Sequence, residues 1–219
     1  MAMIVAIDGP AGAGKSSVSR LLAERLGFQF LDTGAMYRAV ALAALERGLG
    51  DGDEAKIAAM TPQLRLDFTG DRVLLDGRDV TADIRTSRVS AAVYLAADNP
   101  QVREKMVEMQ RKIAGEKDTV TEGRDQGTVA FPHAECKIFL TATPDERARR
   151  RHAELKQRGE EISLEEVLAQ NAARDLRDST RSVGRLIKAE EAVEVYTDGM
   201  TTEQVIGRLE EIVRESRKK

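Results

Sequence analysis

The sequence contains no tryptophan, and its three tyrosines and five phenylalanines bring the aromatic content to only 4%. Aromatic side chains are the surfaces on which the bases of single-stranded nucleic acids stack, so such a binding surface is scarce here. The formal net charge of −3 also argues against a general polyanion-binding surface. We therefore expect no nucleic-acid partner.

Cysteine is almost absent as well. Cys136 is the only one, so the chain can form no internal disulfide, which favours a reducing, cytoplasmic compartment. It adjoins the apolar run 138–140 and is expected to be a buried, inert thiol. The two histidines, His133 and His152, lack the spaced partners of a metal site, so we interpret both as surface or structural residues.

No segment has the pattern of a signal peptide or a membrane span. The N-terminus has no basic region, and Asp8 interrupts its apolar run. The longest apolar stretch, around residues 39–45, is far shorter than the roughly 20 residues that a transmembrane helix needs. We therefore expect no membrane partner.

Residues 9–16, Gly-Pro-Ala-Gly-Ala-Gly-Lys-Ser, match the phosphate-loop pattern G-x-x-x-x-G-K-[ST]. The apolar run 4–7 ahead of them is typical of a buried strand, and apolar residues at helical spacing follow them. In such a strand, turn and helix, backbone N–H groups converge on one phosphate. Lys15 is expected to be a compact, solvent-facing cation for the outer phosphates, and the Ser16 hydroxyl is placed to bind Mg²⁺.

Short strands and helices alternate along the rest of the chain, which indicates an α/β fold in one domain with insertions. An alternating pattern on both sides of residues 69–71 predicts a small antiparallel meander. Gly27 is expected to end the first helix. The expected sheet strands are residues 4–7, 28–31, 119–121, 137–140 and 193–196, and further helices are expected over 33–47, 51–62, 86–97 and 100–115 and after capping boxes at 143–146, 163–166 and 201–204.

Basic residues gather in the two expected helices on either side of Gly159. Charge runs are usually solvated helix faces, and we interpret Arg147, Lys156 and Arg158 in that way. A basic helix, a break and a second helix opposite a phosphate loop can also form a closing lid. Because the chain has a phosphate loop, we expect this pair of helices as a whole to form a lid rather than a solvated surface.

Polar and charged residues also follow two strands of the expected sheet. Tyr37 and Arg38 come one helical turn after the second strand, and residues 122–127 place two acids and an arginine after the third. Ligands bind at such strand ends in open α/β sheets. Tyr37 could also be a core residue beside a solvated Arg38.

Phosphoryl transfer between two phosphates is the reaction that these features favour. The chain has no Asn-Lys-x-Asp segment, which GTPases use to read guanine, and it leaves little length for the coupling domain of a motor. Transfer to a second phosphate requires the charge of both donor and acceptor to be neutralised. Arginine suits this task because its planar fork pairs two phosphate oxygens at once.

Several blocks of the sequence resemble the bacterial cytidylate kinases, a family of nucleoside monophosphate kinases. The resemblance runs from the first strand through Arg181, and its blocks are residues 7–16, 31–38, 84–86, 122–129 and 131–132. It implies that the protein uses ATP, with Mg²⁺, to phosphorylate CMP and dCMP in pyrimidine nucleotide metabolism. The implied fold is a P-loop α/β fold with a five-stranded parallel sheet, flanking helices, a small antiparallel β insertion and a helical lid.

We expect a single kinase domain over residues 1–219 in a cytoplasmic monomer. Its core would comprise residues 1–35, 116–145 and 185–219. Residues 36–115 would form the monophosphate-binding region, with the β insertion at about 63–85, and residues 146–184 would form the lid with the arginine-rich helices.

Position by position, the resemblance implies a role for each block. The phosphates of ATP would be held by Gly9, Pro10, Ala11, Gly12, Ala13, Gly14, Lys15, Ser16 and Ser17, with Ser16 as the protein ligand of Mg²⁺. The substrate would be held by Thr33, Arg38, Arg124 and Arg181 at the acceptor phosphate, by Arg174, Asp178 and Tyr37 at the ribose, and by Arg103 and Asp125 at cytosine. The expected catalytic residues are Lys15, Arg124, Arg181 and, as part of the lid charge, Arg150.

Three positions depart from the family pattern. Thr33 replaces a frequent serine, and Glu122 stands where aspartate also occurs. Tyr94 stands where many members have a serine that contacts the base, so its hydroxyl either replaces that contact or packs away from it. Two other functions stay open: a non-catalytic nucleotide- or RNA-binding regulator, and a UMP/CMP-type or other small-molecule kinase.

Overall fold

The computed structural model describes residues 2–69 and 72–218, which divide into two compact units. The first unit comprises the chain up to Leu31 together with the chain from Ala114 onward, and the second comprises Asp32–Ile113. The phosphate loop and the arginine-rich helices belong to the first unit, and the predicted meander belongs to the second.

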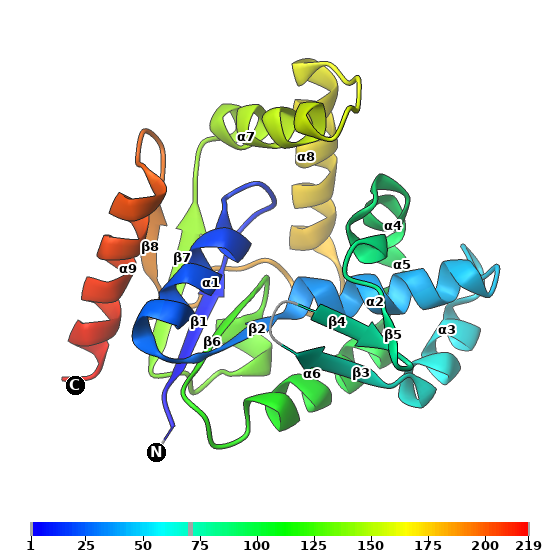
Figure 1. The fold of residues 1–219 in the computed structure, drawn as a ribbon, viewed down its shortest axis with the longest axis horizontal. Coiled ribbons are helices and arrows are strands. Elements are labelled where there is room, and N and C mark those ends of the chain that lie inside the picture. The colour runs from blue at the N-terminus through cyan, green and yellow to red at the C-terminus, as the bar shows by residue number, and fades with distance from the viewer. Residues whose placement is uncertain (1, 70–71, 219) are drawn as a thin grey trace. The chain divides into compact units, whose positions relative to one another are not determined.

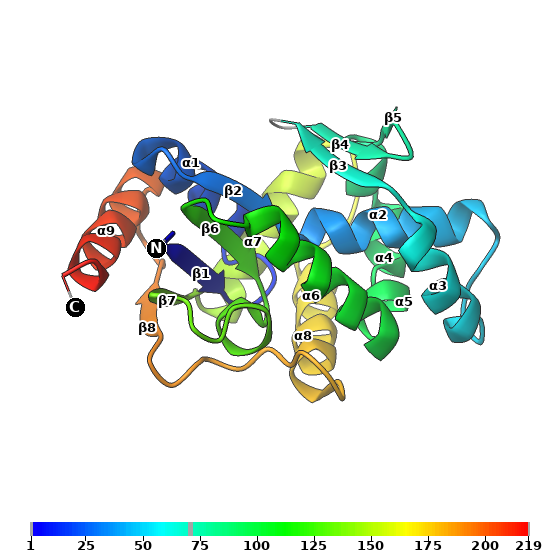
Figure 2. The same cartoon turned by 90° about the horizontal axis from the view of Figure 1, so that it is seen from below.

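A five-stranded parallel sheet forms the centre of the first unit (Figure 2). The strands lie in the order β2 (Gln29–Asp32), β6 (Thr119–Gly123), β1 (Ile4–Asp8), β7 (Cys136–Thr141) and β8 (Val193–Tyr196). Between β6 and β7 the chain passes from one side of β1 to the other. Ligands of open α/β sheets bind at the carboxyl ends of strands where the order reverses in this way, so the end of β1 is the place to expect a site.

Two helices that are far apart in the sequence cover one face of this sheet. α1 (Lys15–Leu26) and α9 (Thr202–Ser216) lie side by side (Figure 1) and pack against it. Leu22 and Leu209 are completely buried in the same cluster as Ile7 and Ile138. Each such side chain contributes about 1.5–3 kcal/mol by leaving water. Gly27 ends α1 in a left-handed conformation, as predicted.

The arginine-rich helices α7 (Pro144–Gln157) and α8 (Leu164–Thr180) pack against each other around a small apolar cluster of Ala148, Leu155 and Val167 (Figure 1). The predicted capping box at residues 163–166 is present, as is the one at residues 201–204.

The capping box predicted at residues 143–146 is only half formed. The Thr143 side chain accepts the N–H of Glu146, but the carboxylate of Asp198 accepts the N–H of Thr143. Glu146 instead pairs with Arg149 and Arg150. The reciprocal prediction is therefore wrong, because a residue distant in the sequence takes the place of the local partner.

The second unit combines helices with the three-stranded antiparallel meander. Its strands are β3 (Leu66–Thr69), β4 (Arg72–Leu75) and β5 (Arg78–Asp79), and residues 70–71 of the predicted turn lie outside the described residues. Its helices are α2 (Thr33–Glu46), α3 (Glu54–Met60), α4 (Ser87–Ala92), α5 (Tyr94–Ala97) and α6 (Pro100–Ala114), and short 3₁₀ turns occupy Thr61–Gln63 and Asp83–Arg85.

The prediction of one helix over residues 86–97 is wrong in detail, because a turn at Val93 separates α4 from α5. α4 contacts α2 and the 3₁₀ turn Asp83–Arg85, whereas α5 contacts α2 and α3. The two halves of the segment therefore follow different neighbours, a division that local helix propensity does not encode.

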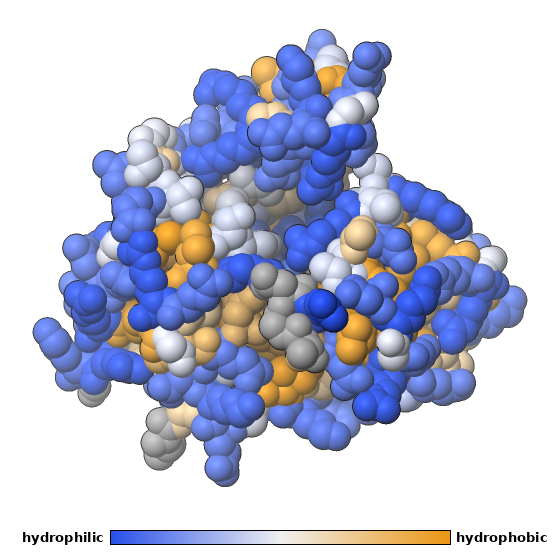
Figure 3. All heavy atoms as spheres, viewed as in Figure 1, coloured by the Kyte–Doolittle hydropathy of each residue, from blue (hydrophilic) through white to orange (hydrophobic). Residues whose placement is uncertain are grey.

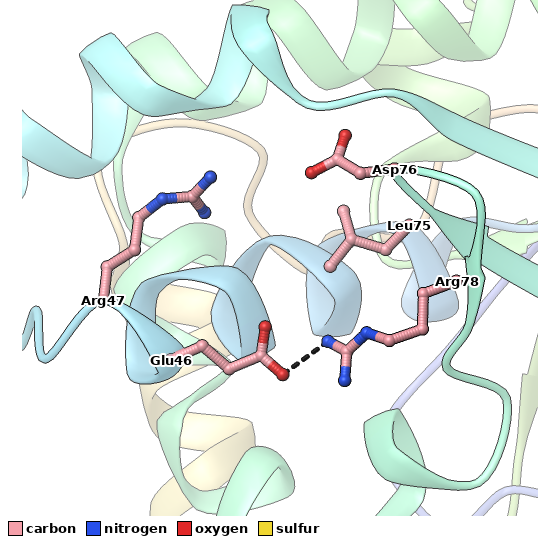
Figure 4. Close-up of a pocket in the computed structure, with 5 residues that line it drawn as sticks. All are labelled: Glu46, Arg47, Leu75, Asp76 and Arg78. Atoms are coloured by element: carbon pink, nitrogen blue, oxygen red, sulfur yellow. Dashed lines mark hydrogen bonds and ion pairs between the residues drawn. The ribbon is translucent and has the colours of Figure 1, made fainter.

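A cavity of about 240 Å³ in the second unit is lined by Glu46, Arg47, Leu75, Asp76 and Arg78. Arg78 pairs with Glu46 at this cavity (Figure 4). None of the five is a predicted site residue. The surface in Figure 3 is mostly hydrophilic, with apolar patches between the charged side chains. Within residues 2–69 and 72–218, no helix is long and apolar enough to cross a membrane.

Candidate active site

The phosphate loop connects β1 to α1 at the carboxyl end of the central strand. A Cβ atom at Gly9 would lie 2.0 Å from the carbonyl oxygen of Leu140, so no other residue fits there without a shift of β7. At Gly12, φ is +76° and a Cβ would lie 3.0 Å from the carbonyl oxygen of Arg147. The loop is thus held in shape by the two elements beside it, which is what a preformed phosphate cradle requires.

Lys15 is buried, with only 5% of its surface exposed, so the prediction of a solvent-facing cation is wrong. Its Nζ donates to the carbonyl oxygen of Pro10 at 2.7 Å, which brings the ammonium back over the loop. Burial and the nearby Arg124 lower the pKa of Lys15 to about 7. A bound phosphate would stabilise the charged form that burial disfavours.

The Ser16 hydroxyl donates to the Glu122 carboxylate at 2.8 Å. Glu122 lies on β6 near its carboxyl end and is 4% exposed. A hydroxyl and a carboxylate are oxygen donors of the kind that Mg²⁺ prefers, and Mg²⁺ bound with phosphates keeps several waters. Over residues 2–69 and 72–218 there is no cluster of three acidic, histidine or cysteine side chains that could hold a metal alone. The donors therefore fit a magnesium ion that arrives with a nucleotide.

Asp178 bonds to two arginines that the resemblance assigns to the acceptor phosphate. Its carboxylate accepts from Nε of Arg124 at 2.8 Å and from the guanidinium of Arg181 at 3.0 Å. Burial alone raises the pKa of Asp178, but Arg124, Arg181 and Arg174 together lower it below its usual value. Arg124 and Arg174 also lower the pKa of Lys15, so this cluster lies within electrostatic reach of the phosphate loop.

Asp125, predicted to read cytosine, follows β6 and is 3% exposed. It precedes a π-helical turn over Gln126–Ala130 that the sequence did not predict. The carbonyl oxygen of Asp125 accepts from the N–H of Val129 and of Ala130, at 2.8 and 3.1 Å. The position of Asp125 is therefore fixed by the turn that follows it.

The second unit holds the remaining predicted substrate residues. Thr33 is the buried first residue of α2, and Arg38 is half-buried one turn later. The guanidinium of Arg103 lies 5.2 Å from the ring centre of Tyr37 and donates to the carbonyl oxygen of Ala97 at 2.8 Å. These contacts place Tyr37 and Arg103 together within the unit.

The Tyr94 hydroxyl donates to Asp51 at 2.8 Å. This bond gives the hydroxyl a protein partner within the second unit. A contact between Tyr94 and the base of the substrate stays a prediction.

The arginines of α7 differ from one another. Arg147 is 6% exposed and bonds to the carbonyl oxygens of Ala142 and Ala11, so its assignment to a solvated face is wrong. Arg147 itself lies against the phosphate loop at Ala11 and Gly12. Arg150 is half-buried and donates to the Thr197 side chain and carbonyl oxygen, at 2.8 Å each. Lys156 and Arg158 are exposed, as predicted.

Sequence reasoning missed Asp8, missed Asp175, which pairs with Arg147, and gave Arg147 no site role. Asp8 was noted only as a break in an apolar run, yet an acid at the end of a buried strand, next to a phosphate loop, was itself a signal. Cys136 was interpreted correctly: it is buried, and burial raises the pKa of its thiol.

Comparison with known proteins agrees with this geometry. Residues 5–215 match the family model described as cytidylate kinase. Cytidylate kinase from Rhodopirellula baltica is 49% identical over 213 residues, covering 97% of this chain and 93% of that protein. Cytidylate kinase from Pelotomaculum thermopropionicum is 50% identical over 207 residues, covering 92% of each chain.

Among solved structures, a shikimate kinase from Bacteroides thetaiotaomicron matches with a TM-score of 0.50 at 12% identity, covering 97% of this chain and 98% of that one. At this identity the match concerns the fold alone. The family model and the two relatives establish membership on sequence, over nearly the whole chain. This chain belongs to the cytidylate kinase family.

Proposed function

We propose that this protein transfers the terminal phosphoryl group of ATP to CMP and dCMP, with Mg²⁺, to give CDP and dCDP. Family membership supports the reaction. The observation that carries it is the arginine cluster around Asp178, which lies within electrostatic reach of the phosphate-loop lysine. Two groups of phosphate-binding residues in one unit suit an enzyme whose donor and acceptor are both phosphorylated.

The donor side of the reaction uses the phosphate loop. Its backbone N–H groups and Lys15 hold the outer phosphates, and Ser16, with Glu122 behind it, supplies the protein oxygen for Mg²⁺. When bound, Mg²⁺ neutralises charge on the phosphate chain. Lys15 is already desolvated, so its charge acts at low dielectric on the group in transfer.

The acceptor side uses arginine in place of a general base. The attacking oxygen belongs to a phosphate and is already anionic, so proton removal is not the main barrier. Arg124 and Arg181 would bring that anion to the donor, and Arg150 would add charge from the lid. Asp178 holds both acceptor arginines in the free protein and would keep one or more of them in place as the phosphate arrives.

An acceptor panel tests the function directly. Formation of ADP from MgATP would be measured with CMP, dCMP, UMP, AMP and GMP at equal concentration. We expect CMP and dCMP to give the fastest turnover. Absence of acceptor-dependent turnover would contradict the proposal, and RNA binding with a steep salt dependence would support the regulator instead.

Asp125→Asn should narrow the preference for CMP over UMP. Cytosine presents an amino donor where uracil presents a carbonyl acceptor. A carboxylate only accepts, so it pairs with the amino group and repels the uracil oxygen, whereas an amide can donate to that oxygen. A hydrogen bond to a charged group contributes ~1.5–3 kcal/mol, so kcat/KM for CMP should fall at least about tenfold.

Arg103→Ala is the matched control for this specificity. Arginine can donate to the pyrimidine O2, which both bases share, so both substrates should lose efficiency together. The measurement is kcat/KM for CMP and UMP in each variant. If Asp125→Asn lowers both equally and keeps their ratio, Asp125 does not read the base.

A further inference from the structure

The carboxylate of Asp8 makes two hydrogen bonds that connect the end of β1, just before the phosphate loop, to the segment after β6. It is the last residue of β1 and is 5% exposed. Its Oδ1 accepts the N–H of Gln126 and its Oδ2 accepts the N–H of Gly127, each at 2.8 Å. Each carboxylate oxygen thus takes one backbone donor from a segment 118 or 119 residues away.

The two donors belong to the start of the π-helical turn Gln126–Ala130, and the first N–H groups of a helix have no acceptor within the regular helical hydrogen-bond pattern. They are buried, and a buried N–H without an acceptor is costly. Only a carboxylate offers one acceptor to each of two adjacent N–H groups. An asparagine would offer one acceptor and one donor, so one N–H would face an NH₂ group.

Other contacts hold the same segment from different sides. Asp8 pairs in register with Gly123 across the β1–β6 ladder. The Thr121 hydroxyl donates to the Gln126 side chain at 2.8 Å. These bonds fix the strand and the side chain, whereas Asp8 is bonded to the backbone that immediately follows Arg124 and Asp125.

The buried position of Asp8 disfavours the charged form of its carboxylate. Burial raises the pKa of Asp8 to about 6, and the two N–H groups lower it from what burial alone would give. The charge of Asp125 raises the pKa of Asp8 and the charge of Lys15 lowers it. A charged residue held in so buried a place is consistent with a task that a neutral side chain does not perform.

We propose that Asp8 is a positioning residue for base selection: its carboxylate fixes the turn that orients Asp125, so discrimination between cytosine and uracil depends on a residue adjacent to the donor loop. The inference rests on the proposed function. Asp8, the residue immediately before the phosphate loop, would thus act on the acceptor site through the backbone of Gln126 and Gly127.

The test compares Asp8→Asn and Asp8→Glu with the wild type. Asn loses one of the two acceptors, and Glu keeps the charge but moves the carboxylate by one methylene. We expect both variants to narrow the ratio of kcat/KM for CMP to that for UMP by about tenfold, which corresponds to the loss of one charged hydrogen bond. Amide hydrogen exchange at Gln126 and Gly127 should quicken in Asp8→Asn.

Asp118→Asn is the matched control. Asp118 accepts the N–H of Met3 at 2.7 Å, so it bridges the same two strands at their opposite end. It should affect stability and leave the CMP/UMP ratio unchanged. If Asp8→Asn and Asp8→Glu lower both substrates equally, Asp8 is merely structural and the proposal is wrong. If only Asp8→Asn changes the ratio, the glutamate carboxylate still accepts both N–H groups, and amide exchange at Gln126 and Gly127 should quicken in Asp8→Asn alone; unchanged exchange in Asp8→Asn would contradict the proposal.

A second variant and the activity of the wild type distinguish the possible outcomes of this test. If Asp8→Asn does not fold, Asp8→Glu carries the same ratio test, with direct calorimetric binding of CMP and UMP. A wild-type protein that fails to phosphorylate CMP would contradict the proposed function. An active wild type with an unchanged ratio in both variants would contradict the role of Asp8 alone.

Discussion

Replacement of Lys15 by methionine should abolish phosphoryl transfer and at the same time stabilise the nucleotide-free protein. The loss of activity follows from its place in the phosphate loop, since groups that stabilise developing charge contribute ~10²-fold or more to the rate. The gain in stability follows from burial, because Lys15 is 5% exposed and its ammonium bonds only one carbonyl oxygen, that of Pro10, among the contacts described.

The size of the gain follows from the pKa of Lys15, which burial and Arg124 lower from 10.5 to about 7. Such a shift corresponds to a cost of up to about 5 kcal/mol for the charged form. Part of this is offset in the variant, because Asp8 loses a nearby positive charge. We expect the free energy of unfolding to rise by about 2 kcal/mol at pH 7.

The pH dependence has a definite sign. Between pH 7 and 10.5 the unfolded lysine binds a proton that the folded one has released, so the free energy of unfolding of the wild type rises with pH over this window. Methionine has no such titration. The advantage of Lys15→Met should therefore be largest at pH 7 and below and should shrink from pH 7 to pH 9.

Urea unfolding of both proteins at pH 7, 8 and 9, together with ADP formation, measures all three effects. Lys156→Met is the matched control, since Lys156 is exposed and its loss should change neither stability nor turnover much. A Lys15→Met protein that retains a tenth of wild-type turnover, or that is destabilised at pH 7, would contradict this account.

Arg147→Ala should be strongly destabilising, by about 3–5 kcal/mol. The side chain is buried, pairs with Asp175, and donates to the carbonyl oxygens of Ala142 at 3.1 Å and Ala11 at 3.0 Å. Removal of Arg147 leaves the half-buried Asp175 carboxylate without this partner and two carbonyl oxygens without their donor. For a chain of this length the melting temperature should fall by about 10 °C.

The same contacts link α7 and α8 to the phosphate loop, so the loss should also raise KM for ATP. The backbone of Gly12 lies directly against Arg147, and Arg147 bonds the neighbouring Ala11. Lysine cannot replace it, because a single ammonium does not reach three acceptors in the geometry of the guanidinium fork.

Arg149→Ala on the same helix is the control, since Arg149 is exposed and pairs only with Glu146 among the ion pairs described. It should change the free energy of unfolding by no more than about 0.5 kcal/mol. A double-mutant cycle with Asp175→Asn should show a coupling of at least about 1 kcal/mol. Equal effects of Arg147→Ala and Arg149→Ala would show that both arginines belong to a solvated face.

The sequence by itself determined the features whose causes are local. The phosphate-loop pattern, the αL stop at Gly27 and the capping boxes at Ser163 and Thr201 depend on residues a few positions apart, and all four are present in the structure. Strand and helix alternation indicated the α/β fold, and an alternating apolar pattern predicted the meander, whereas the parallel sheet was implied by the family resemblance; both sheets are present. The blocks that resemble the cytidylate kinases also predicted the reaction, since together they are far more specific than the phosphate-loop pattern alone.

Tertiary structure alone decided what the charged residues do. Arg147 bonds a carbonyl oxygen 136 residues away, and Asp8 bonds N–H groups 118 and 119 residues away. Lys15 is buried, and the charges of Arg124 and Glu122, more than 100 residues away in sequence, act on it. A charged side chain in a sequence can equally be solvated or paired in the interior, and the free energies differ by several kcal/mol. Which of the two occurs depends on the partners that long-range folding brings to it.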